Sequence, residues 1–224
     1  QMKAAVPFLD LRVLKTKEYA LSVFGSILLY LVLMGSSMLM PLYVQSILGK
    51  SATISGLVVL PGSLVSAFLS PIAGRIYDKV GIRIITIIGG SSLVLSNIGM
   101  FFIHIHTGIW MAVCLNILRC AATGCLLMPF VTWGNKNIPP ELTAHGTALL
   151  TSLRTVAGAI GTAVFVGIMN TVARNSHTLT GSAALLHGMN VSFLVMTVAS
   201  GLLLFTGLFL IKDSRTEVLI EVEN

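Results

Sequence analysis

Long apolar stretches alternate with short polar segments along the whole chain. Six of these stretches reach about 20 residues, the length that a helix needs to cross about 30 Å of hydrocarbon at about 1.5 Å per residue. None alternates polar and apolar positions as the strands of a membrane β-barrel do. The pattern therefore predicts an all-α membrane protein with six transmembrane helices, which cover residues 19–40, 52–73, 84–105, 109–131, 144–172 and 191–211.

The composition indicates that these helices lie in a lipid bilayer. Of the 224 residues, 55% are hydrophobic and 10% are charged, whereas about a quarter of the residues in soluble domains are charged. A soluble core of this size needs a polar surface that so few charges do not supply. We therefore expect one transmembrane domain over residues 19–211, preceded by a cytoplasmic linker at residues 1–18 and followed by a cytoplasmic tail at residues 212–224.

Basic residues gather on one side of the predicted spans. Because Lys and Arg accumulate at the cytoplasmic ends of membrane helices, we expect a multi-pass protein of a bacterial plasma membrane with both termini in the cytoplasm. This orientation leaves Lys50 and Arg174 on the outside. On the cytoplasmic side it places Lys3, Arg12, Lys15, Lys17, Arg75, Lys79, Arg83, Lys136, Lys212 and Arg215.

Several kinds of chemistry find no support in the sequence. No basic face with interleaved aromatic residues lies outside the spans, so a nucleic-acid partner is not expected. The spacing of Cys114, Cys120 and Cys125 fits neither a disulfide framework nor a metal site, and His104 and His106 have no third ligand nearby. No catalytic triad, paired carboxylates or phosphate-binding loop occurs in an exposed segment. We predict no enzymatic activity, no metal and no cofactor.

A charged turn separates the second and third predicted spans. Its sequence is GRIYDKVGIR, residues 74–83. Topology alone favours basic residues here, with Asp78 near a basic neighbour and Gly81 allowing a tight reversal. The charged residues of the turn are Arg75, Asp78, Lys79 and Arg83.

The spacing within this turn is more specific than topology requires. Gly74, Asp78 and Gly81, with the basic residues after them, resemble the G-x-x-x-D-[RK]-x-G-x-[RK] signature of major facilitator superfamily transporters. In that superfamily the signature lies in the cytoplasmic loop between the second and third helices of a six-helix half, which is also its position here. Ile82 departs from the pattern, because the family often has a basic residue there. The resemblance implies a gating role for Gly74, Arg75, Asp78, Lys79, Gly81 and Arg83.

Other stretches resemble the C-terminal half of the fourteen-span drug:proton antiporters. They are PFLDLRVLKTKEYA, LPGSLVSAFLSPIAGRIYDKVG, ILRCAATGCLLMP and IPPELTAHGTALLTSLRTVAGAIGTAV. The resemblance implies six helices forming one half, a 3+3 repeat, of the superfamily fold, and export of amphipathic drugs in exchange for protons by alternating access. The implied partners are a small-molecule substrate, protons, the lipid bilayer and an N-terminal half that precedes residue 1.

Charge inside the predicted spans is rare and entirely basic. All eight carboxylates lie in loops or tails, so a carboxylate that carries protons is expected in the missing half. Arg119 lies about ten residues from either end of its span, where facing lipid would cost about 2.5 to 3.5 kcal/mol. It shares one helical stripe with Asn116 and Thr123. We expect this stripe to order water, substrate or a carboxylate of the other half, or else to form a structural network.

Two further stripes are candidates for the cavity or for helix packing. Arg154 shares a face with Gly158 and Gly161, where small residues permit close approach of helices, so we favour a structural or gating contact. In the first span, Ser26, Tyr30 and Ser37 fall on one stripe beside two methionines. That mixture suits varied apolar ligands, and it also suits ordinary packing.

A different class of function stays open at this point. A six-span scaffold that transports nothing, or an inactive remnant of a transporter, would have the same apolar pattern and the same topology. The two hypotheses differ in whether about eight more spans are encoded upstream of residue 1.

Overall fold

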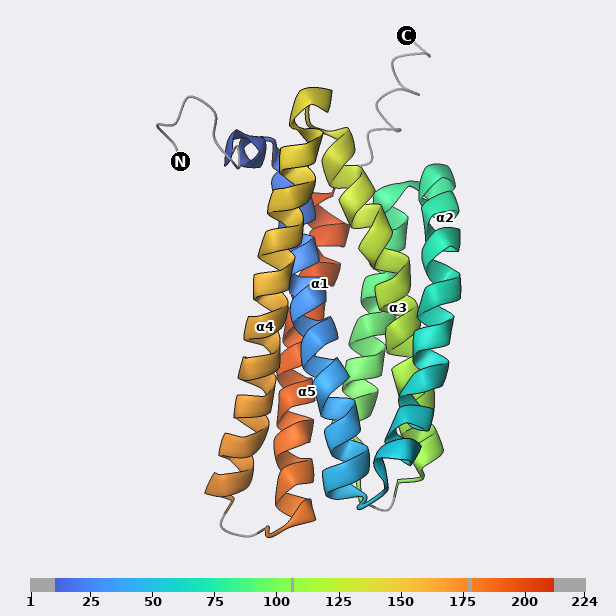
Figure 1. Ribbon diagram of the computed structural model, residues 1–224, viewed down its shortest axis with the longest axis vertical. Coiled ribbons are helices and arrows are strands. Elements are labelled where there is room, and N and C mark those ends of the chain that lie inside the picture. The colour runs from blue at the N-terminus through green and yellow to red at the C-terminus, as the bar shows by residue number, and fades with distance from the viewer. Residues whose placement is uncertain (1–10, 106, 177–178, 212–224) are drawn as a thin grey trace.

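The computed structural model describes residues 11–105, 107–176 and 179–211, which form a bundle of long helices (Figure 1). The helices are α1 (Lys17–Leu42), α2 (Ala52–Phe101), α3 (Ile109–Lys136), α4 (Thr143–Asn175) and α5 (Ser182–Phe205). The 3-10 turns Leu11–Lys15 and Pro140–Leu142 precede α1 and α4, and the π-helical turns Tyr43–Ile47 and Thr206–Leu210 extend α1 and α5. Outside the described residues lie residues 1–10 of the predicted linker, the predicted tail at residues 212–224, and Lys3, His106, Lys212 and Arg215.

Five helices of the described chain are long and apolar enough to cross a membrane. Four of them, counted with their flanking turns, have 28 to 36 residues, or about 42 to 54 Å at about 1.5 Å per residue. That length spans the hydrocarbon and reaches the headgroups on both sides. The fifth, α2, has 50 residues and would be about 75 Å long if it were straight, which is too long for one crossing.

The chain reverses direction within α2. Gly81 has φ of 79° and ψ of 172°, which is not helical and separates the segments 52–80 and 82–101. Figure 1 shows these two segments side by side, joined at the end of the bundle where α3 ends and α4 begins. Only glycine adopts this backbone conformation without a steric penalty, so the reversal occurs at the residue that permits it.

Close helix packing holds the bundle together. As a whole, α2 packs mainly on α3, α1 packs mainly on α4, and α5 lies against α4 and α2. At Gly124 of α3, a Cβ would lie 2.9 Å from the Ser66 carbonyl oxygen of the first α2 segment. A side chain there would push the two backbones apart, so glycine sets the spacing of these helices.

The helices differ in extent from the apolar runs that predicted them. The first α2 segment continues past residue 73 through Gly74 to the reversal, and α5 begins at Ser182, nine residues before the predicted start at residue 191. The second α2 segment ends at Phe101, before the predicted end at residue 105. An apolar run marks the part of a helix suited to hydrocarbon, whereas backbone hydrogen bonding continues into polar sequence until a residue breaks it.

Candidate functional site

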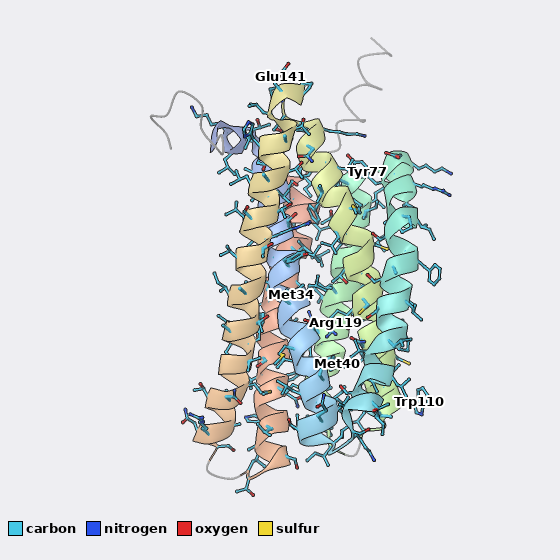
Figure 2. The ribbon with its side chains drawn as sticks, viewed as in Figure 1. Met34, Met40, Tyr77, Trp110, Arg119 and Glu141 are labelled. Carbon is cyan, nitrogen blue, oxygen red and sulfur yellow. The ribbon has the colours of Figure 1, made fainter. Side chains whose placement is uncertain are left out.

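Arg119 is buried in the middle of the bundle. Its side chain is 3% exposed, and Figure 2 places it between Tyr77, towards one end, and Trp110, at the other. Its Nη2 donates a hydrogen bond to Asn116 Oδ1 one turn earlier on α3. Thr123, one turn later, is also buried and donates through its hydroxyl to the Cys120 carbonyl at 3.0 Å. The fold therefore places the whole predicted stripe of α3 inside the bundle.

This cluster has more hydrogen-bond donors than acceptors. Arg119 Nη1 and Asn116 Nδ2 are buried and have no hydrogen-bond partner among the described residues. The Cys120 thiol lies 3.8 Å from Asn116 Oδ1, the oxygen that already accepts from Arg119. An arginine cannot release its proton under ordinary conditions and offers only donors. The site therefore suits an acceptor, above all one that carries a negative charge.

Gly62, in the first α2 segment, leaves room for this cluster. A Cβ at Gly62 would lie 2.8 Å from Asn116 Nδ2 and 2.9 Å from Cys120 Sγ. Both distances are shorter than the contacts that Cβ atoms make with non-bonded atoms in proteins. A larger residue at position 62 would therefore displace the Asn116 or the Cys120 side chain. Sequence patterns offered no reason to select Gly62, because the α3 residues that Gly62 approaches, Asn116 and Cys120, are more than 50 positions away.

No acidic side chain of the described residues compensates Arg119. The acids in the described ranges are Glu18, Asp78 and Glu141, all exposed and near helix ends. A buried charge without a partner is costly, because the interior solvates it much less well than water does. The arrangement leaves a positive charge in the bundle interior that an anionic ligand or an acidic group from outside these ranges can neutralise, and to which a water molecule can offer a hydrogen-bond acceptor.

A second basic residue contacts an aromatic ring between α1 and α4. The guanidinium carbon of Arg154 lies 5.1 Å from the centre of the Tyr30 ring, which is the geometry of a cation–π contact. A Cβ at Gly158 would lie 3.3 Å from that ring and 2.7 Å from Met34 Cγ. Gly161 abuts the backbone of Leu31. Tyr30, Arg154 and the two glycines therefore meet at one helix contact, which the sequence had treated as two separate stripes.

The other members of the α1 stripe, Ser26 and Ser37, differ in exposure. Ser26 is 3% exposed and faces the core. Ser37 is exposed and donates to the Met34 carbonyl of its own helix at 2.8 Å. The bond within the helix is the usual one for a serine in a membrane segment, and it leaves the serine oxygen free to accept from a ligand at the surface of α1.

The charged turn of α2 reaches neighbouring helices. Lys136 Nζ, at the end of α3, lies 3.9 Å from Asp78 Oδ1 and 5.1 Å from the centre of the Tyr77 ring. Arg83 Nη2 donates to the Leu208 carbonyl, just beyond α5, at 3.2 Å. The sequence suggested basic partners for Asp78 within the turn itself. It missed Lys136, which is 58 positions away and becomes a neighbour only when α3 packs beside α2.

Basic side chains of the described residues lie mostly at one end of the bundle. That end holds the start of α1, the reversal of α2 and the end of α3 (Figure 1). The opposite end carries Lys50 and Arg174. The basic residues at the first end are Lys15, Lys17, Arg75, Lys79, Arg83 and Lys136.

Comparisons with known proteins agree with this architecture. The model of the Major Facilitator Superfamily matches residues 1–162. An uncharacterized MFS-type transporter, YcnB of Bacillus subtilis, is 36% identical over 198 residues, which cover 88% of this chain and 42% of YcnB. The lincomycin resistance protein LmrB of Listeria innocua is 32% identical over 76% of this chain and 36% of its own length.

A multidrug exporter is also similar. The multidrug export protein EmrB of Escherichia coli is 27% identical over 70% of this chain and 31% of its own length. The chain thus spans less than half the length of each of these relatives.

Proposed function

Because the chain belongs to the Major Facilitator Superfamily, we propose that it forms the C-terminal six-helix half of an exporter of amphipathic drug-like molecules, driven by protons. The names of relatives such as LmrB and EmrB support the substrate class. The reversal at Gly81 supports six membrane crossings, because it lets α2 cross twice. The excess of basic side chains at one end supports a cytoplasmic location for that end and for both termini.

The unpaired donors around Arg119 are the observation that carries this proposal. A carrier that rocks between two states needs interior groups whose partners change with the state. Arg119 Nη1 and Asn116 Nδ2 are buried without partners among the described residues, so a group from the N-terminal half or from the substrate would gain strongly by reaching them. A scaffold that transports nothing gains nothing from a buried, unpaired donor pair of this kind.

The other site residues take supporting roles in the proposal. The contact of Arg154 with Tyr30 lies where α1 and α4 touch, so changes in their spacing would break or form it. The pair of Asp78 with Lys136 ties the α2 turn to α3 at the proposed cytoplasmic end. Protons would be carried by a carboxylate of the N-terminal half, since the acids in the described ranges all lie near helix ends.

The test is drug transport into everted vesicles by the full-length protein with Arg119→Gln. Glutamine keeps polarity and much of the length but removes the charge, so we expect the rate of drug uptake driven by a proton gradient to fall at least tenfold, the effect of about 1.4 kcal/mol. Arg174→Gln is the matched control, because Arg174 is exposed at the end of the bundle that carries few basic residues, outside the buried cluster.

Membrane insertion is measured in the same vesicles by the amount of protein. A normal amount of Arg119→Gln protein with an unchanged transport rate would contradict the role of Arg119. If the unaltered full-length protein moves no drug and confers no resistance, the non-transporting scaffold is favoured instead.

A further inference from the structure

A crevice of about 180 Å³ opens between the two segments of α2 and α3. Ile76, from the first α2 segment, and Ile88, from the second, line it and are 42% and 62% exposed. Ala121 and Cys125 of α3 also line the crevice. The crevice therefore lies on the outer surface of the bundle, away from the buried Arg119 side chain.

The lining is almost entirely apolar. Its serine, Ser92, donates its hydroxyl to the Ile88 carbonyl of the same helix at 2.9 Å. An apolar cavity of about 150 Å³ is known to stay dry and to accept benzene or xenon. A crevice of similar size therefore favours an apolar occupant over water. In a chain that spans a membrane, lipid is the apolar material present in excess.

The depth of the crevice matches one leaflet of a bilayer. Ile85 and Ser92, which line it, follow Gly81 by four and eleven residues, or about 6 and 16 Å along a helix. If the reversal lies at the membrane surface, the crevice covers the depth of acyl chains in the nearer half of about 30 Å of hydrocarbon.

The turn above the crevice is positively charged. It carries Arg75, Lys79 and Arg83 against the single acid Asp78, which lies 3.9 Å from a further base, Lys136. Basic residues next to a membrane attract anionic lipids by about 1 kcal/mol each. The basic turn suits an anionic headgroup, and the apolar crevice below it suits an acyl chain. The two features together match an anionic phospholipid.

We propose that the crevice between α2 and α3 holds an acyl chain of an anionic phospholipid whose headgroup lies over the basic turn. The occupant would stabilise the packing of both α2 segments on α3, because it fills space that the side chains leave empty. The proposal requires insertion into a membrane but not transport, so it stands or falls independently of the role of Arg119.

Photocrosslinking in nanodiscs tests the proposal. The chain is reconstituted with phosphatidylglycerol or with phosphatidylcholine, each carrying a diazirine on an acyl chain, and the crosslinked peptides are mapped by mass spectrometry. We expect crosslinks concentrated at residues 85–92 and 118–125, with phosphatidylglycerol exceeding phosphatidylcholine about fivefold or more, the effect of one basic residue. Crosslinks spread evenly over the outer surface, including Val156 and Ile160 of α4, would overturn it, as would equal labelling by the two lipids.

Two variants with matched controls separate the apolar and the charged parts. Ala121→Leu fills the crevice and should lower crosslinking at residues 85–92 severalfold, whereas Ala67→Leu, exposed on α2 outside the crevice, should not. Arg75→Gln should reduce the preference for phosphatidylglycerol about fivefold, whereas Lys50→Gln, at the opposite end, should leave it unchanged. If Ala121→Leu crosslinks as strongly as the unaltered chain, the acyl chain does not occupy the crevice. An unchanged preference for phosphatidylglycerol in Arg75→Gln would show that the headgroup does not lie over the turn.

Discussion

Asn116, the hydrogen-bond partner of Arg119, and Gly62 depend on each other, although they lie on different helices. The Asn116 amide and the Cys120 thiol fill space that a side chain at position 62 would take, since a Cβ there would lie 2.8 Å from Asn116 Nδ2 and 2.9 Å from Cys120 Sγ. The helix positions of Arg119 and Asn116 follow from local sequence. Their burial and their unpaired donors follow from the contact with α2. At the scale of single residues, the site is thus a feature of two helices together.

Substitution of Gly62 should disturb this cluster. Gly62→Val would force Asn116 or Cys120 to move, and overpacking of this kind costs about 1 to 3 kcal/mol. We expect the melting temperature of the purified chain to fall by several degrees. Gly56→Val is the matched control, because Gly56 lies on the same segment with open space around its Cβ position. Equal melting temperatures for the two variants would show that Gly62 does not confine the cluster.

At the scale of elements, the reversal within α2 places two consecutive helical segments next to each other in the bundle. Its two segments lie side by side because Gly81 adopts a backbone conformation that is essentially restricted to glycine. Without this reversal the charged turn would continue as helix and its contacts with α3 and with the end of α5 would be lost. The turn sequence therefore carries several of the basic residues at this end of the bundle and also forms the joint between the two α2 segments.

Replacement of Gly81 should cost stability that replacement of Gly74 does not. Gly81→Ala places a Cβ in a strained conformation at a cost of about 1 to 3 kcal/mol. Gly74→Ala is the control, because Gly74 lies inside the first segment with open space at its Cβ position, and alanine favours a helix there. We expect thermal unfolding in detergent to shift downward only for Gly81→Ala. A Gly74→Ala variant that melts as low as Gly81→Ala would contradict this account.

At the scale of the whole molecule, contacts between helix ends join the two sides of the bundle. Asp78 approaches Lys136 and Arg83 reaches the Leu208 carbonyl, so the α2 turn touches both α3 and the end of α5. Exposed ion pairs of this kind contribute about 0 to 1 kcal/mol. Such a contribution is small for folding but enough to shift an equilibrium between two states of a carrier by up to about fivefold.

In the proposed full-length exporter, removal of this ion pair should change the relative populations of the two conformational states. We expect Asp78→Asn to change the alkylation rate of a cysteine placed at Thr151, an exposed position near the basic end of α4, by up to about fivefold. The double exchange Asp78→Lys with Lys136→Asp should restore much of the original rate, because it rebuilds the pair. Glu141→Gln serves as the control for loss of an exposed acid at the same end. An identical alkylation rate in Asp78→Asn and the unaltered protein would show that the ion pair does not affect the balance between the two states.

Local patterns predicted much of the fold and the family. Apolar runs located the membrane-compatible helices, Gly81 marked the reversal, and the comparisons confirmed the resemblance to the Major Facilitator Superfamily. Helix ends were predicted less well, as at Ser182, because polar residues continue a helix as readily as apolar ones do. The pairing of Tyr30 with Arg154 was not predicted, because neither residue carries information about its distant neighbour.

The sequence by itself determined that this protein is a set of membrane helices with few interior charges, because span length, apolar content and charge position are properties of contiguous residues. Only the tertiary structure decided that Gly62 makes room for Asn116, that Asp78 approaches Lys136, and that a crevice remains between α2 and α3. These contacts depend on which faces of distant helices meet, and the packing of the whole bundle selects those faces.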